Sequence, residues 1–174
     1  MTTYANKFLS IDSGGVITEL TGVTTSTANA IPALDGSGLL SITMMPAGVG
    51  GAAVTATVGT AGVTAGDLVC FSGTTTLTVN RAKADSMSTR AQGFVLDTVT
   101  SGNTVTVYLE GIDTAIVGGG AAGGVELFLS DTTGGQVTAT RPTDPGTIVQ
   151  SVGFGVGVTG AAKLMFIPGA AVQL

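Results

Sequence analysis

Several residue types that build enzyme and metal sites are absent or scarce in this sequence of 174 residues. There is no histidine, no tryptophan and a single cysteine, Cys70. Without histidine, a serine or cysteine nucleophile lacks the base that usually activates it, and zinc sites made of histidine and cysteine are excluded. One cysteine cannot form an internal disulfide. We therefore expect a protein that is not an enzyme and that needs no cofactor or metal.

Charge is scarce as well. Only 10% of the residues are charged, and six basic residues against eleven acidic ones give a net charge of −5, which opposes binding to nucleic-acid phosphates. The longest stretch without a charge lies between Asp35 and Asp67, but Pro46 interrupts it and no apolar membrane span is present. We expect neither nucleic acid nor membrane as a partner. Because 44% of the residues are hydrophobic, we expect surface to be hidden against other subunits.

The abundant residues favour β-structure. Valine and threonine dominate, and 28 glycines interrupt any helical pattern. In residues 104–109, Val105, Val107 and Leu109 alternate with polar or aromatic neighbours, which is typical of a half-buried strand. Short strands of this kind, separated by turn residues, predict an all-β fold: a small antiparallel β-barrel or sandwich.

Two stretches of the chain resemble each other, and they predict that the β-domain is built from two similar halves. The copies run over about residues 65–111 and 123–169. Ser72 aligns with Ser130, Phe94 with Phe154, and Gly111 with Gly169. Each copy reads as two strands joined by a turn, a loop, a strand that contains Gly-Phe, a tight turn and a further strand. We place this domain at residues 51–174.

Residues 1–50 differ from the rest, and we expect them to form an extended N-terminal arm with a hairpin. The hairpin would pair residues 8–11 with 16–20 around a turn at 12–15. The following segment is apolar but has no regular pattern, which is typical of a segment that lies on another surface: its own domain, a sister subunit or a foreign partner. The residues that we predict to bind a partner are Ile31, Leu34, Leu39, Leu40, Ile42, Met44 and Met45.

Three alternating glycines form a second candidate site. Gly153, Gly155 and Gly157 would leave one face of a strand as bare backbone, which allows another backbone to approach closely. Crowding inside a small barrel and contact with another subunit both explain this pattern, and we predict a subunit contact. Separately, Glu110 and Asp113 could act as paired carboxylates, but aromatic platforms and further acidic ligands are too sparse to favour a sugar or calcium site.

A set of short motifs, taken in order, resembles small virion structural proteins of tailed bacteriophages, and most closely those that decorate or cement the outer capsid. The motifs are AIPALDGSGLL at 30–40, MMPAGVG at 44–50, AGDLV at 65–69, RAKAD at 81–85, GFVL at 93–96, VYLEG at 107–111 and VQSVG at 149–153. The resemblance spans most of residues 28–169. Similar stretches with Ala-Leu-Asp also occur in phage tail-fibre and collar proteins.

The resemblance implies a capsid decoration protein that is made in the bacterial host cytoplasm and located in the virion. There it would bind the outer surface of the head and tie neighbouring major capsid subunits together, as a homotrimer without catalytic residues or cofactors. The negative charge suits the outside of the shell, away from packaged DNA. The alternative is a tail or head fibre, that is, a receptor-binding structural protein.

Overall fold

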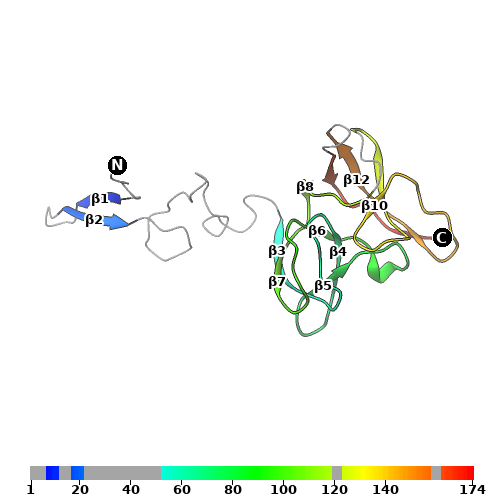
Figure 1. Ribbon diagram of the computed structural model, residues 1–174, viewed down its shortest axis with the longest axis horizontal. Helices are drawn as coiled ribbons and strands as arrows, with labels where there is room; N and C mark the ends of the chain where they lie inside the picture. Colours follow the sequence, from blue (N-terminus) through cyan, green and yellow to red (C-terminus); the bar gives the residue numbers. More distant parts are fainter. Residues whose placement is uncertain (1–6, 12–16, 22–51, 119–122, 158–161) are drawn as a thin grey trace. The chain divides into compact units, whose positions relative to one another are not determined.

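A computed structural model describes residues 7–11, 17–21, 52–118, 123–157 and 162–174 of the chain (Figure 1). The chain divides into two units, Met1–Gly50 and Gly51–Leu174. In the first unit, β1 (Lys7–Ile11) pairs antiparallel with β2 (Ile17–Thr21), which is the predicted hairpin. The predicted turn at 12–15 lies outside the described residues.

The second unit begins with a closed five-stranded barrel. Its strands follow the order β3-β5-β4-β6-β7, and β3 closes the ring against β7. A short 3-10 helix, η2 (Met87–Thr89), lies between β5 and β6. The strands are β3 (Ala53–Val58), β4 (Leu68–Ser72), β5 (Thr78–Arg81), β6 (Gly93–Val95) and β7 (Thr104–Tyr108).

Small branched side chains fill this barrel, because a narrow ring of strands leaves little interior space. The predicted all-β barrel is therefore confirmed. One pair departs from the antiparallel expectation: β3 and β5 run parallel, with Val58 opposite Val79. The buried interior consists of Ala56, Val58, Val63, Val69, Val79, Val95, Val105 and Val107.

A second sheet follows, with the strand order β10-β9-β12-β13-β8. Beside it, a two-stranded sheet joins β11 (Ile148–Val149) to β14 (Val172–Gln173) near the end of the chain. The five strands of the larger sheet are β8 (Gly111–Asp113), β9 (Glu126–Leu129), β10 (Val137–Thr138), β12 (Ser151–Val156) and β13 (Lys163–Phe166).

The two halves have the same topology. If the barrel is cut between β3 and β5, its order becomes β5-β4-β6-β7-β3, which matches β10-β9-β12-β13-β8 strand for strand. Where β3 and β5 close the first half, a single parallel bridge between Gly118 and Val137 stands in the second. The similarity therefore includes β3, which lies before the first predicted copy, and β8, which begins at the last residue of that copy and extends beyond it.

The halves share one apolar core. On β4, Val69 points into the barrel, whereas Leu68 packs on the outside of the barrel against the second sheet, and both are fully buried. Phe94 on β6 stacks on Tyr108 with ring centroids 5.4 Å apart, and the edge of Phe166 from β13 approaches it at 5.5 Å. Strands buried on both faces read as continuous apolar runs, which explains the Leu-Val-Cys-Phe sequence of β4.

A buried amide also links the halves. Gln150, which follows β11, is 2% exposed. Its Oε1 accepts a hydrogen bond from the N–H of Ala91 at 2.8 Å, and its Nε2 donates to the Ala91 carbonyl at 2.9 Å. The backbone of Ala91 thus satisfies the polar atoms that burial would otherwise leave without partners.

The shared core predicts a strong response at Phe94. We expect Phe94→Ala to lower the free energy of unfolding by about 3–5 kcal/mol, because the neighbouring side chains can only partly fill the cavity that the lost ring leaves. Urea unfolding followed by circular dichroism measures the loss. Leu77→Ala, which truncates an exposed side chain, serves as the control and should cost less than about 1 kcal/mol. Equal losses for the two variants would contradict the assignment of this core.

Candidate functional site

The predicted site residues fall into two groups. The seven apolar residues between Ile31 and Met45 lie outside the described residues, so their contact with a partner stays a prediction. The glycines are described: Gly153 and Gly155 lie on β12, and Gly157 directly follows it. The structure therefore describes the surroundings of the glycines, and an exposed surface lies beside them on β12.

Gly153 needs its bare backbone inside the chain. Its φ of +134° belongs to a region that other residues rarely adopt, and an added Cβ would collide with the carbonyl oxygen of Met165 on β13. Gly155 is buried, and its N–H and C=O bond to Val125 and Gly124, each at 2.8 Å. Crowding within the sheet thus explains Gly153, while the subunit contact predicted for the three glycines stays a prediction.

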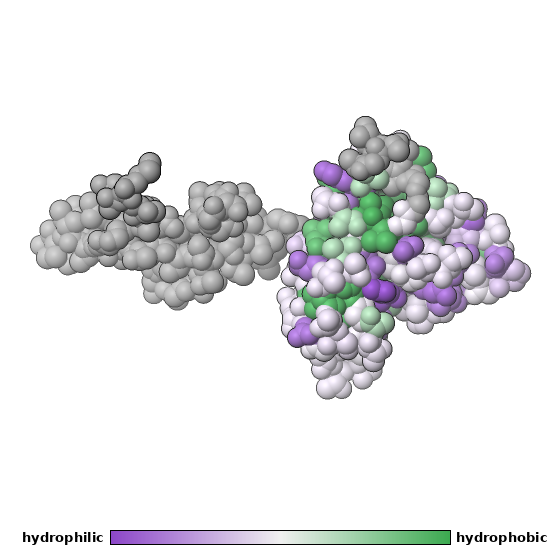
Figure 2. Space-filling view, in the orientation of Figure 1, coloured by the Kyte–Doolittle hydropathy of each residue, from purple (hydrophilic) through white to green (hydrophobic). Residues whose placement is uncertain are grey.

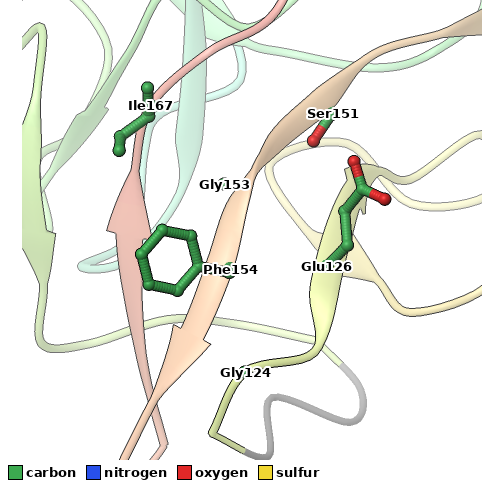
Figure 3. Close-up of a pocket in the computed structure, with 6 residues that line it drawn as sticks. All are labelled: Gly124, Glu126, Ser151, Gly153, Phe154 and Ile167. Carbon is green, nitrogen blue, oxygen red and sulfur yellow. The ribbon is translucent and has the colours of Figure 1, made fainter.

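A shallow groove of about 420 Å³ lies over this part of β12 (Figure 3). Gly153 lies between its two sides. The side chains of Phe154 and Ile167 lie together on one side, and those of Glu126 and Ser151 lie on the other (Figure 3). The groove residues are Gly124, Glu126, Ser151, Gly153, Phe154 and Ile167.

Phe154 belongs to a row of side chains that crosses the outward face of the second sheet. Phe154 on β12 is opposite Glu126 on β9 and opposite Met165 on β13. Met165 is in turn opposite Ile112 on β8. Directly opposite residues of an antiparallel pair lie on the same face. We call these four residues, Glu126, Phe154, Met165 and Ile112, the outer row.

The outer row and its neighbour Ile167 expose large apolar side chains. Phe154 is 40% exposed, Ile112 47% and Ile167 57%. Single exposed apolar residues are ordinary, but several that adjoin on one sheet face are typical of an interaction site. This concentration identifies the outward face of the second sheet as the candidate functional site.

The charges near this face are few. Glu126 and Lys163 are both exposed, and Lys163 is opposite Val156, two residues beyond Phe154 on β12. In the described part of the chain, the ion pairs are Arg81 with Asp67 and Lys83 with Asp85, both in the first half. Most of the visible described surface is pale, and strongly hydrophilic residues are scattered over it (Figure 2). A partner that covers the outer row must therefore accommodate the charges of Glu126 and Lys163.

Asp113 is a buried carboxyl on the inward face of β8. It is fully buried, its Oδ1 accepts a hydrogen bond from the Ala115 N–H at 2.9 Å, and its Oδ2 has no partner. Burial raises the pKa of Asp113 to about 6; the bond from Ala115 opposes this shift, and the charge of Asp67 adds to it. Glu110 is exposed, so the two carboxyls considered as a pair lie in different environments.

Within the described residues, no group of three or more acidic or cysteine side chains could hold a metal ion. No helix in the part of the chain that the structure describes is long and apolar enough to cross a membrane. Comparisons with protein-family models, curated proteins and solved structures find no match to this chain.

Sequence reasoning predicted a contact at Gly153, Gly155 and Gly157 but did not identify Phe154 or the rest of the outer row as site residues. The alignment of Phe94 with Phe154 treats the two rings as equivalent, yet Phe94 is 1% exposed and Phe154 is 40% exposed. Ile112 and Ile167 carry no local signal, because they follow or precede turns rather than lie in long alternating runs. The one sequence signal was the internal repeat. If the repeat had been extended to include β3 and β8, the strands that carry the outer row could have been predicted.

The burial of Asp113 predicts an unusual dependence of stability on pH. Its pKa in the folded chain lies above the unfolded value, so the folded state favours the protonated form. The contribution of Asp113 to the free energy of unfolding is then greatest below about pH 4. It falls by up to about 3 kcal/mol as the pH rises to about 6, and it stays at the lower value above that pH. Asp113→Asn cannot ionise and should remove this part of the fall.

Urea unfolding at about pH 4 and about pH 7 measures the difference for each variant. Asp144→Asn is the matched control, because Asp144 is exposed and should leave the fall in place. If Asp113→Asn shows the same change between the two pH values as the original chain, the carboxyl is not the cause.

Proposed function

We propose that this chain is a capsid decoration protein of a tailed bacteriophage. In this role it binds the outer surface of the head and ties neighbouring major capsid subunits together. The observation that carries the proposal is the rigid, weakly charged β-module of residues 51–174, which a separate N-terminal unit precedes. The partner, the major capsid protein, is inferred from the resemblance of the ordered motifs to phage decoration proteins.

Rigidity is what a cementing protein needs, because it must hold the distance between its neighbours while packaged DNA presses on the shell. Two features of residues 51–174 provide it. The barrel is closed, so it leaves no sheet edge free to open. The second sheet shares the core around Phe94 with the barrel, so the halves resist movement against each other.

The surface chemistry favours a protein partner on the outside of the shell. Only 10% of the residues are charged, which favours apolar contact with protein, and the net charge of −5 opposes association with DNA. The predicted contacts of Ile31, Leu34, Leu39, Leu40, Ile42, Met44 and Met45 with a capsid subunit complete this role. Self-association as a homotrimer, location in the virion and the absence of a cofactor belong to the same proposal.

The alternative is a tail or head fibre that binds a receptor. The groove beside Gly153 favours it, because the ring of Phe154 lines one side of the groove and the side chains of Glu126 and Ser151 line the other. An apolar face with a few hydrogen-bonding groups is typical of small-ligand sites. The groove is shallow and its apolar residues continue into the outer row, so a broad protein contact suits it better.

Imaging separates the two roles. Purified particles of the phage that carries this chain are labelled with a gold-conjugated antibody against it and viewed by electron microscopy. Label distributed over the head is expected. Label confined to the tail or to a fibre would replace the decoration role by the alternative.

Removal of residues 1–50 tests the part assigned to the arm. The remaining unit, Gly51–Leu174, contains both buried clusters and should fold by itself. We expect it to unfold cooperatively but to lose most of its co-sedimentation with phage heads that lack the protein, because the apolar contacts of the arm are gone. Heads mixed with the full chain serve as the control. Equal binding by the truncated and full chains would show that the arm is not the attachment segment.

A further inference from the structure

The first half of residues 51–174 contains a row of the same kind as the outer row. On the outside of the barrel, Leu68 is opposite Phe94, and Phe94 is opposite Tyr108. Tyr108 is in turn opposite Ala53 on β3. These four residues cross β4, β6, β7 and β3 in order. We call Leu68, Phe94, Tyr108 and Ala53 the inner row.

The two rows occupy equivalent places in the duplicated topology. The inner row crosses β4-β6-β7-β3, and the outer row crosses β9-β12-β13-β8, which are the corresponding strands. Phe94 and Phe154 are the second members of their rows, and each follows a glycine. The same face of the same unit is therefore present twice in the chain.

The difference between the rows is what covers them. The second sheet covers the inner row: Leu68 and Phe94 are 0% and 1% exposed, and Phe166 packs on the ring of Phe94. The described residues leave the outer row open, with Phe154 40% and Ile112 47% exposed. A face that a β-sheet covers in the first half is left uncovered by the described residues in the second.

Charge indicates what kind of surface covers the outer row. Glu126 is opposite Phe154 on one side, and Lys163 lies on the neighbouring strand on the other side. Glu126 and Lys163 thus lie on opposite sides of Phe154. If copies of the chain meet at a symmetry axis close to Phe154, Glu126 of one copy approaches Lys163 of the next. The surface is thus complementary to itself, which a foreign partner does not need.

We propose that a second copy of this chain covers the outer row, so that copies pack row against row around a symmetry axis near Phe154. This rests on the self-association included in the proposed function and assigns it to a surface. It does not depend on attachment to a capsid, because self-association is measured on the purified chain alone.

Light scattering coupled to size-exclusion chromatography measures the mass of the full chain and its variants. The original chain is expected to be oligomeric, and Phe154→Lys should weaken assembly by at least about tenfold, because a charged side chain replaces the apolar ring at the centre of the contact and must lose its water. Met87→Lys is the matched control: Met87 is 41% exposed, as Phe154 is 40% exposed, but it lies on η2 in the first half. The control should assemble like the original chain.

A cysteine pair gives a second readout that does not depend on a disruptive charge. Phe154→Cys should form a disulfide between copies on mild oxidation, since equivalent residues meet near the axis. Met87→Cys should not do so. The natural Cys70 is buried and remains a silent thiol in both variants.

The outcomes are decisive. A monomeric original chain, an unchanged mass for Phe154→Lys, or equal crosslinking of the two cysteine variants would each overturn the proposal. If the chain is monomeric and antibody still labels the phage head, the capsid role survives and only the self-contact fails. If the chain assembles through Phe154 but labels no head, the self-contact stands without the capsid role.

Discussion

The fold depends on the contact between the outside of the barrel and the second sheet. At its centre, the ring of Phe94 lies between Tyr108 of its own barrel and Phe166 of the other half. The strands that carry this contact are buried on both faces, so each residue change in β4 or β6 acts either on the barrel interior or on the shared core. A change at this contact in one half therefore also affects the other half.

The closure of the first half and the openness of the second follow from this arrangement. The barrel fills its interior with valine and completes its ring by the parallel pair of β3 and β5. The second sheet instead uses the corresponding face, with larger residues such as Leu127 and Leu164, to cover the barrel. Among the described residues, the bridge between Gly118 and Val137 links the two edges of this sheet. The same strand order thus forms a closed barrel in the first half and a sheet that packs on the barrel in the second.

The sequence alone allowed the class of fold and its duplication to be predicted. Alternation in residues 104–109 and recurrent glycines are local signals, and both survive in the structure as short strands and tight turns. The parallel pair of β3 with β5 could not be predicted, because alternation shows which face of a strand is buried but not which strand lies beside it. The conformation of Gly153 was also hidden, since a sequence of alternating glycines does not show which one has a positive φ.

The candidate site was harder to predict than the fold. Phe94 and Phe154 share a local Gly-Phe sequence, yet one ring is buried and the other exposed, because exposure depends on what packs over the strand. The buried state of Asp113 has the same origin: its neighbours Gly111 and Ile112 reveal a strand but not the side that faces Leu164. Such differences arise from tertiary packing, for which single-sequence patterns hold no signal.

The position of β3 has a mechanical consequence. It is the first strand after the N-terminal unit, and it is paired along its length with β7 and, at its end, with β5. A pull transmitted through residue 52 would load the hydrogen bonds on both sides of β3 together, along the strand axis, instead of peeling one edge bond by bond. The strand that receives the tension is thus the strand that closes the barrel. A pull on the N-terminal unit therefore acts against the hydrogen bonds that hold the whole barrel together.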